Sequence, residues 1–212
     1  NRTTTAELTH ELNDDTRLTV SAQYYEGKVR DYGSLVYPDL LGPNPTTPTV
    51  YPIFKLYLPT NIRESTLDTN LGSKVEALGG DHELLVGINY DNTHFNSGMS
   101  GVESIGELDL ANPGYGISYG AKPETMLSQT NRYETKALYV QDQATYGRFH
   151  LLGALRLTQL DINQQEQGLD TSYHRMTPRF GITYDLTESL ALYAAYSTGF
   201  RGAFNFTGNE TP

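Results

Sequence analysis

Apolar and polar side chains alternate along most of this chain with a period of two residues. For example, Leu84, Val86 and Ile88 alternate with Gly87 and Asn89. A period of two sends successive side chains to opposite faces of a β-strand, whereas an α-helix repeats about every 3.6 residues. The pattern therefore predicts an all-β chain whose strands each have one apolar and one polar face.

Eight antiparallel strands are expected, joined by connections that alternate between short and long. The strands are predicted at about residues 2–12, 17–32, 62–78, 82–96, 132–146, 148–163, 173–186 and 189–200. Tight turns with the sequences NDDT, LGGD, YGR and TES follow every second strand. Long connections are predicted at about 33–61 and 97–131, and a shorter one at about 164–172.

This alternation is typical of a transmembrane β-barrel, which has short periplasmic turns and longer extracellular loops. The predicted strands exceed the usual length of about five or six residues, and about 9–11 tilted residues suffice to cross a bilayer. Lipid cannot satisfy backbone N–H and C=O groups, so a spanning sheet must close on itself. We expect the apolar faces to meet lipid and the polar faces to meet an aqueous lumen.

Composition agrees with a sheet that has only one apolar face. Hydrophobic residues make up 37% of the 212 residues, and the net charge is −10. A nucleic-acid-binding protein would be basic, so that partner class is not expected. The absence of cysteine excludes disulfides, thiolate metal sites and cysteine nucleophiles. The chain also has no run of about 18 apolar residues that would predict a transmembrane helix.

Two segments carry a specific order of strand and turn sequences. They are ALYVQDQATYGRFHLLGALRLTQLD at 137–161 and TPRFGITYDLTESLALYAAYSTGFR at 177–201. This order resembles the barrel of TonB-dependent outer-membrane receptors, and the siderophore-receptor branch most closely. A weaker match is GDHELLVGINYDNT at 80–93, and the remaining residues match only in rhythm.

The resemblance implies a barrel of about 22 strands that is plugged by an N-terminal globular domain. Residues 1–212 are then expected to be a partial barrel domain of about eight central strands, without the plug, its TonB box or the C-terminal strands. Tryptophan is absent, although such barrels usually mix Trp and Tyr at the membrane interfaces. The 16 tyrosines can fill that role.

The function implied by the resemblance is TonB-dependent uptake of a ferric siderophore across the bacterial outer membrane. The implied partners are outer-membrane lipid, the iron chelate and the TonB–ExbB–ExbD complex, which would act through the plug. Haem, cobalamin, copper and glycan uptake stay open as alternatives. So do a complete eight-stranded barrel with a structural or adhesive role and a soluble all-β binding module.

No catalytic residue, resident metal or covalent cofactor is predicted. The histidines show no metal-ligand spacing, and they are His10, His82, His94, His150 and His174. Ser, His and Asp all occur, but no G-x-S-x-G nucleophile elbow does. We therefore expect a transport protein that is not an enzyme.

The candidate ligand-binding residues are aromatic side chains of the long loops and arginines of the lumen. Aromatic faces suit planar chelates, and arginine can hold an anionic one. The candidates are Tyr37, Tyr51, Phe54, Tyr57, Tyr115, Tyr119, Arg156 and Arg179. The alternative is that the aromatics form a small core under the loops and that the arginines pair with carboxylates of the wall or plug.

Overall fold

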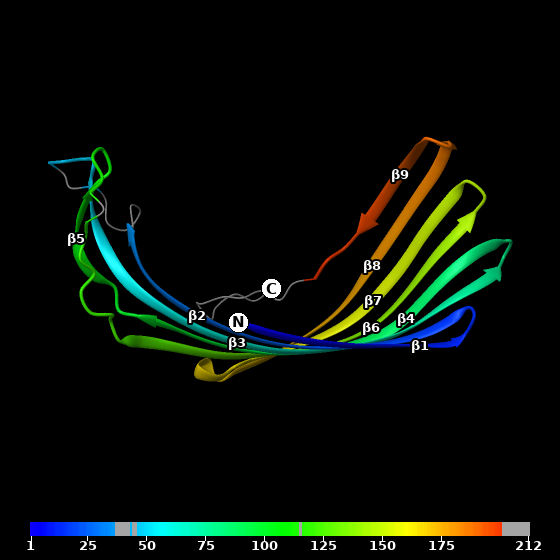
Figure 1. Cartoon of the computed structure of the whole chain (residues 1–212), viewed down its shortest axis with the longest axis horizontal. Helices are drawn as coiled ribbons and strands as arrows, with labels where there is room; N and C mark the ends of the chain where they lie inside the picture. The colour runs from blue at the N-terminus through cyan, green and yellow to red at the C-terminus, as the bar shows by residue number, and fades with distance from the viewer. Residues whose placement is uncertain (37–42, 44–45, 115, 201–212) are drawn as a thin grey trace. The chain divides into compact units, whose positions relative to one another are not determined.

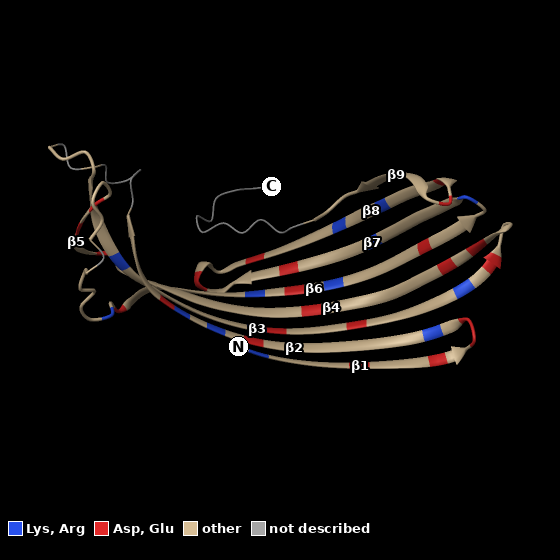
Figure 2. Ribbon diagram, turned by 45° about the horizontal axis from the view of Figure 1, so that its top comes forward, with Lys and Arg blue, Asp and Glu red and all other residues tan. Residues whose placement is uncertain are grey.

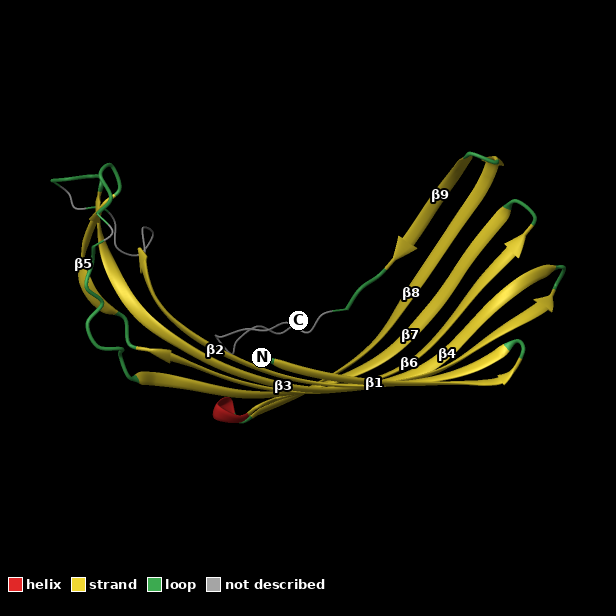
Figure 3. Cartoon of the chain, viewed as in Figure 1, coloured by secondary structure: helices red, strands yellow, loops and turns green. Residues whose placement is uncertain are grey.

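The computed structural model describes residues 1–36, 43, 46–114 and 116–200. These residues form β-strands almost throughout, with a single short 3₁₀ helix (Figure 3). The strands are β1 (Arg2–Asn13), β2 (Thr16–Val36), β3 (Val50–Ala77), β4 (Gly80–Ser100), β5 (Glu103–Asp109), β6 (Thr125–Tyr146), β7 (Phe149–Gln164), β8 (Leu169–Thr187) and β9 (Leu190–Ser197). The helix, η1, covers Gln165–Gln167.

The strands form one sheet in the order β1-β2-β3-β4-β6-β7-β8-β9, and β5 pairs with β3 outside this path. Each long strand is thus the neighbour of the next long strand along the chain (Figure 1). Strands β1 and β9 end the order within the described residues. This up-and-down antiparallel sheet confirms the predicted fold class.

Two compact units can be distinguished within the described residues. Unit 1 comprises Asn1, Glu26–Ile62 and Phe95–Thr130, and unit 2 comprises Arg2–Tyr25, Arg63–His94 and Asn131–Pro212. Unit 1 therefore holds β5 and the residues that flank the two long connections. Unit 2 holds all the tight turns.

The pairing in unit 2 is regular enough to follow each face across several strands. The β6–β7 register runs without a shift from Asn131↔Gln164 to Tyr146↔Phe149, and the β7–β8 register runs from Phe149↔Tyr184 to Gln164↔Leu169. One irregularity lies between Asp185 and Thr187, where β8 pairs with β9. Residues opposite one another in these ladders share a face of the sheet.

One face of β6–β8 is an apolar belt. Its successive rows across the three strands are Leu138–Leu157–Met176, Val140–Leu155–Pro178, Asp142–Gly153–Phe180, Ala144–Leu151–Ile182 and Tyr146–Phe149–Tyr184. Many of these side chains are exposed, including Phe180 at 55% and Met176 at 62%. The belt is thus not covered by a second layer of described residues, and the prediction of two-faced strands is confirmed.

The belt has the length that a membrane requires. On β6 it extends over nine residues, from Leu138 to Tyr146, and about 9–11 tilted residues cross a bilayer. Aromatic residues end it at the turn, where Tyr146, Phe149 and Tyr184 form the last row. Aromatic side chains are typical of a membrane–water interface.

The tight turns lie where the sequence predicts them. At one of them both Leu78 (φ 52°) and Gly79 (φ 81°) have positive φ, as a two-residue hairpin turn requires. At another, the Asp15 amide donates to Asn13 Oδ1 at 3.0 Å, which is the turn chemistry expected of Asn. Among the described residues, no helix is long and apolar enough to cross a membrane.

The long connections contain more strand than the sequence predicts, and this is a correction. Strand β3 begins at Val50 rather than about residue 62, β6 begins at Thr125 rather than about residue 132, and β5 lies inside the predicted loop 97–131. Proline cannot donate to a ladder, and the first part of β3 contains Pro52 and Pro59. Pairing of β3 with β5, from Val50↔Asp109 to Lys55↔Glu103, nevertheless extends the sheet there.

Positive and negative residues are interspersed along the strands rather than separated by sign (Figure 2). The net charge of −10 is therefore not concentrated in one acidic strand. Local pairs of opposite charge recur instead, such as Lys55 with Glu103 in unit 1 and Lys136 with Glu134 in unit 2.

Candidate functional site

A buried lysine organises unit 1. The Lys55 ammonium lies 3.0 Å from Glu103 Oε2 and donates to the carbonyl oxygens of Tyr119 at 3.1 Å and Ala121 at 2.8 Å. Only 8% of Lys55 is exposed. Burial of a charge is costly unless it is paired and hydrogen-bonded, and Lys55 has both kinds of partner. We call this group, Lys55 with Glu103 and the carbonyls of residues 119 and 121, the loop clasp.

The loop clasp holds the segment around Tyr119 onto β3. The Tyr32 hydroxyl also lies within 3.2 Å of the Tyr119 and Ala121 carbonyl oxygens. The sequence analysis does not predict a role for Lys55, although its place along the strand indicates one. Lys55 occupies the same face of β3 as Ile53 and Tyr57, so a charged residue interrupts an apolar, buried row.

Two of the predicted aromatic ligand contacts take part in packing within unit 1. Tyr57 is only 8% exposed, and the Lys122 ammonium lies 4.0 Å above the centre of its ring. The Tyr119 ring meets Tyr32 edge-on at 5.7 Å, and its hydroxyl lies 2.7 Å from Ser34 Oγ. These contacts are those of a small loop core.

The other predicted aromatics are placed as follows. Tyr51 and Phe54 are half-buried on β3. Tyr37 and Tyr115 lie outside the described residues. Ligand contact by these six aromatic side chains stays a prediction.

On the polar face of unit 2, Arg156 belongs to a network that spans four strands. Arg156 Nη2 donates to Asn89 Oδ1 at 3.0 Å, and its guanidinium lies 5.8 Å from the centre of the Tyr139 ring. The Tyr139 hydroxyl in turn donates to Asp68 Oδ1 at 2.8 Å, and Asn70 donates to the same oxygen at 3.1 Å. We call these five residues the wall network.

The wall network depends on a glycine. A Cβ added at Gly87 would lie 2.4 Å from Tyr139 Cζ and 2.9 Å from Asn70 Cβ. Tyr139 therefore crosses β4 directly over Gly87 to reach Asp68 on β3. The sequence places Tyr139 on the same face as Gln141 and Gln143, which indicates a polar setting, but not the partner two strands away.

Arg179, the second predicted arginine, lies outside this network. It is exposed, opposite Ala154 in the β7–β8 register and opposite Ser197 in the β8–β9 register. The same register puts it on the face of Arg156, because Arg156 pairs with Thr177 and Ala154 pairs with Arg179. The structure thus brings one predicted arginine into a wall network and leaves the other exposed on the same face.

A polar cluster interrupts the apolar belt near the tight turns. His82 Nδ1 lies 2.9 Å from Asp142 Oδ2, and the Tyr146 hydroxyl lies 3.0 Å from His82 Nε2. His82 is 8% exposed. These bonds join the start of β4 to the end of β6, and they satisfy a carboxylate that faces the belt.

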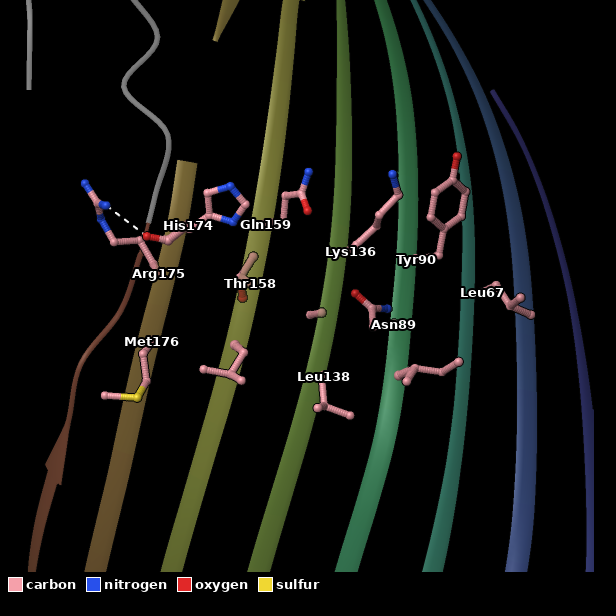
Figure 4. Close-up of a pocket in the computed structure, with 13 residues that line it drawn as sticks. Leu67, Asn89, Tyr90, Lys136, Leu138, Thr158, Gln159, His174, Arg175 and Met176 are labelled. Atoms are coloured by element: carbon pink, nitrogen blue, oxygen red, sulfur yellow. Dashed lines mark hydrogen bonds between the residues drawn. The ribbon is translucent and has the colours of Figure 1, made fainter. Parts of the chain in front are cut away.

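A shallow groove, which we call the lateral groove, lies over the belt row of Leu138, Leu157 and Met176. It has a volume of about 770 Å³ and an apolar floor of Leu67, Ile88, Leu138, Leu157 and Met176. At one end the floor meets polar side chains of the next row, among them Tyr90, Lys136, Gln159 and His174 (Figure 4). All these residues belong to unit 2, and none was predicted as a site residue.

No group of three or more His, Asp or Glu side chains within the described ranges is arranged to hold a metal ion. The polar face offers hydrogen-bond donors, aromatic rings and exposed arginines, among them Arg175 and Arg179. Such groups can bind and orient a solute.

Comparison with known proteins defines the class of protein. Residues 1–211 match the family model described as "TonB dependent receptor-like, beta-barrel". The chain therefore belongs to the TonB-dependent receptors and forms part of an outer-membrane β-barrel. In barrels of this class an apolar face meets lipid, a polar face lines the lumen and the short turns are periplasmic, so the apolar belt, the polar face and the tight turns are expected to take these places.

The chain is similar to particular siderophore receptors. It is 27% identical over 142 residues to the ferrioxamine B receptor of Salmonella typhimurium, an alignment that covers 63% of this chain and 19% of the relative. Among solved structures, it resembles BauA, the ferric preacinetobactin receptor from Acinetobacter baumannii, with a TM-score of 0.78, 13% identity and coverage of 92% and 29%. The closed form of Fiu, the ferric-catecholate import receptor from E. coli K12, gives a TM-score of 0.75, 18% identity and coverage of 92% and 32%.

The similarities to solved structures and the similarity to the ferrioxamine B receptor support different conclusions. The identities to BauA and Fiu are low, so they show the barrel fold alone. The chain spans 19% of the length of the ferrioxamine B receptor that it matches. The predictions of a TonB-dependent receptor, a partial barrel sheet and an outer-membrane location are confirmed by the family match and these folds.

Proposed function

We propose that this chain supplies wall and extracellular loops to a receptor that imports a ferric siderophore through the outer membrane. The main support is the match of residues 1–211 to the TonB-dependent receptor barrel. A curated relative is a ferrioxamine B receptor, which makes ferrioxamine B the first ligand to test. The iron chelate is cargo, and the receptor makes and breaks no covalent bond.

The energy for transport would come from outside this chain. We propose that the TonB–ExbB–ExbD complex acts on a plug domain inside the barrel, and that the wall network faces that interior. Loops of unit 1 would contact the chelate before the plug moves. A rigid wall suits this role, because a binding site built on rigid elements keeps its geometry while another part moves.

The ligand contacts proposed within the chain are the predicted aromatics and arginines. Tyr51 and Phe54 are half-buried and Arg179 is exposed, so each presents surface to a solute. Tyr57 and Tyr119 would act through the loop core, which positions the loop surface. The proposed role of Arg156 is indirect, since its guanidinium is already engaged with Asn89 and Tyr139.

Uptake by the full-length receptor tests the proposed function. The receptor gene that contains this chain is expressed in a bacterium lacking its own siderophore receptors, and ⁵⁵Fe-labelled ferrioxamine B and a ferric catecholate are supplied. We expect TonB-dependent accumulation of one of these chelates and growth under iron limitation. Deletion of TonB should abolish both, and the unchelated iron control should not change. Failure to accumulate any iron chelate would contradict the proposal, and uptake of haem or cobalamin instead would replace the proposed cargo.

A further inference from the structure

We propose that the lateral groove is a binding site for a phosphate-bearing lipid of the outer leaflet. An acyl chain would lie on the apolar floor of Leu138, Leu157 and Met176. The phosphate would lie at the row formed by Lys136, Gln159 and His174. This inference rests on the outer-membrane location of the barrel and does not depend on which solute is transported.

The first observation is the abrupt change from apolar to polar side chains. In the ladders, Leu138 pairs with Leu157 and Leu157 pairs with Met176. The next row on the same face is Lys136 with Gln159 and Gln159 with His174. One step of the pleat thus separates a hydrocarbon-facing row from a row of hydrogen-bond donors, which matches the junction between an acyl chain and its headgroup.

The second observation is the exposed apolar surface of the floor. Ile88 is 58% exposed, and Leu138 and Leu157 are each nearly half exposed. The groove volume of about 770 Å³ lies within the range of about 300–1,000 Å³ that is usual for small-molecule sites. A hydrocarbon chain is the occupant that such a floor favours, because burial of apolar area is worth about 25 cal/mol per Å².

The third observation is the charge at the end of the groove. The ionisable side chains that line it are basic or neutral, and they include Lys136 and His174 but no carboxylate. Figure 4 shows the side chains of Lys136, Gln159 and His174 on three adjacent strands at the same level, with Tyr90 beside Lys136. Together they form a row of donors that is complementary to a phosphate.

The nearest carboxylates lie one row farther from the belt and already have partners. Glu134 pairs with Lys136 at 2.6 Å and with Arg132 at 3.0 Å. Asp161 accepts hydrogen bonds from Gln159 at 2.9 Å and from Ser172 at 2.6 Å. Lysine has three donor protons, and the Lys136 side chain is 54% exposed, so it can bond Glu134 and a phosphate together.

These carboxylates also restrict the headgroup. An anion placed beyond Lys136 would approach Glu134 and Asp161, which repel it. A phosphate directly attached to the acyl-bearing part of the lipid would instead stop at the donor row. The charge pattern therefore favours an anionic lipid whose phosphate lies at the level of the membrane interface.

Native mass spectrometry of the full-length receptor in a non-ionic detergent tests this site. The probe is phosphatidic acid with two ten-carbon chains, and the matched probe is the diacylglycerol with the same chains. We expect phosphatidic acid to bind about five- to tenfold more tightly, as one or two exposed charge-assisted hydrogen bonds would provide. Inorganic phosphate at the same concentration should not displace it.

Variants then locate the binding. The double variant Lys136→Gln/His174→Gln should lower phosphatidic acid affinity about five- to tenfold, to that of the diacylglycerol. Lys136→Arg should retain binding, because the charge stays at the donor row. Arg148→Gln, which removes one positive charge at a periplasmic turn, is the control and should bind like the wild type. Circular dichroism of each variant confirms the β-sheet before binding is measured.

Three outcomes would overturn the proposal. Equal affinity for the diacylglycerol would mean that the groove binds acyl chains without recognising a phosphate. Unchanged affinity in the double variant would place the lipid elsewhere, and displacement by inorganic phosphate would mean a simple anion site. None of these outcomes bears on siderophore uptake, so the two proposals fail independently.

Discussion

At the scale of single residues, the wall network shows how a side chain can depend on the absence of another. Tyr139 of β6 reaches Asp68 of β3 only because Gly87 of β4 leaves the space between them open. The alternation of residues predicts that Tyr139 and Arg156 lie on the polar face. It does not predict their contact, because the register between neighbouring strands is needed to place Tyr139 opposite Arg156.

Replacement of Gly87 tests this dependence. Gly87→Ala would put a methyl group 2.4 Å from the Tyr139 ring, so the ring must move and its bond to Asp68 must break. We expect the full-length receptor to lose about 1–3 kcal/mol of unfolding free energy, as is usual for overpacking. The measurement is denaturant-induced unfolding in detergent.

Gly153→Ala is the matched control, because a Cβ at Gly153 would have no atom within 4 Å. This variant on β7 should unfold like the wild type. Equal stability of the Gly87 and Gly153 variants would show that Tyr139 can reach Asp68 by another path.

At the scale of the elements, the regular strands are well predicted and the irregular ones are not. Strands with strict alternation and a turn sequence at one end, such as β7 (Phe149–Gln164), begin and end within one residue of the prediction. The first part of β3 contains two prolines, and β5 spans only seven residues, so neither shows the long alternation that predicts a strand. Partners distant in sequence stabilise both strands, and a single sequence does not reveal such partners.

In the candidate site, too, contacts between residues distant in sequence could not be predicted. Lys55 forms bonds with residues more than 60 positions away, as the Lys55–Ala121 contact shows with a separation of 66. The aromatics of the loops could be predicted by type, but the loop clasp that holds them could not. Loop contacts of this kind depend on geometry rather than on periodicity.

The stability of the turn that follows β5 is expected to depend on pH through Asp109. The Asp109 carboxylate accepts hydrogen bonds from the Thr49 side chain and from the Ala111 amide, and these bonds lower its pKa below the usual value of 3.8. A depressed pKa in the folded state contributes stability above the unfolded pKa, and this contribution is lost as the pH falls through the folded value. The turn after β5 should therefore loosen only in acid.

Asp109→Asn should reproduce the acid state at neutral pH. We expect faster hydrogen exchange of the Leu110 amide, which bonds the Thr49 carbonyl at 2.8 Å, after correction for intrinsic rates. The difference from wild type should be present at pH 7 and vanish once the pH falls below the lowered pKa of Asp109, where the wild-type carboxyl is protonated too. Glu107→Gln, a neighbouring exposed carboxylate, should change nothing, and an equal effect of both variants would contradict the role of Asp109.

At the scale of the whole molecule, the two faces of the sheet differ in polarity. Family membership places this sheet in the wall of an outer-membrane barrel, and the exposed apolar belt gives the physical reason. The proposed transport function requires this separation, because the wall must enclose a water-filled interior within hydrocarbon.

Charged side chains introduced on the two faces of β6 should destabilise folding into bilayers to different degrees. Val140 lies in the second row of the belt, between Leu138 and Asp142, and the adjacent Gln141 lies on the opposite, polar face. We expect Val140→Arg to weaken folding of the full-length receptor into bilayers by about 2–4 kcal/mol, and Gln141→Arg to have little effect. Folding yield into lipid vesicles, measured by the heat-dependent shift in gel mobility, gives the comparison. Equal losses would contradict the assignment of the faces.

The unbroken ladder between β6 and β7 limits how relatives of this receptor can diverge. Sixteen consecutive pairs, from Asn131↔Gln164 to Tyr146↔Phe149, contain no bulge that could absorb an added residue. A single insertion there would exchange inside for outside along the rest of the strand, so mutations that alter chain length are tolerated only in the connections. Under the proposed transport function, a preference for a different ligand can thus evolve by lengthening or shortening loops, while the strands that carry the loops keep a fixed length.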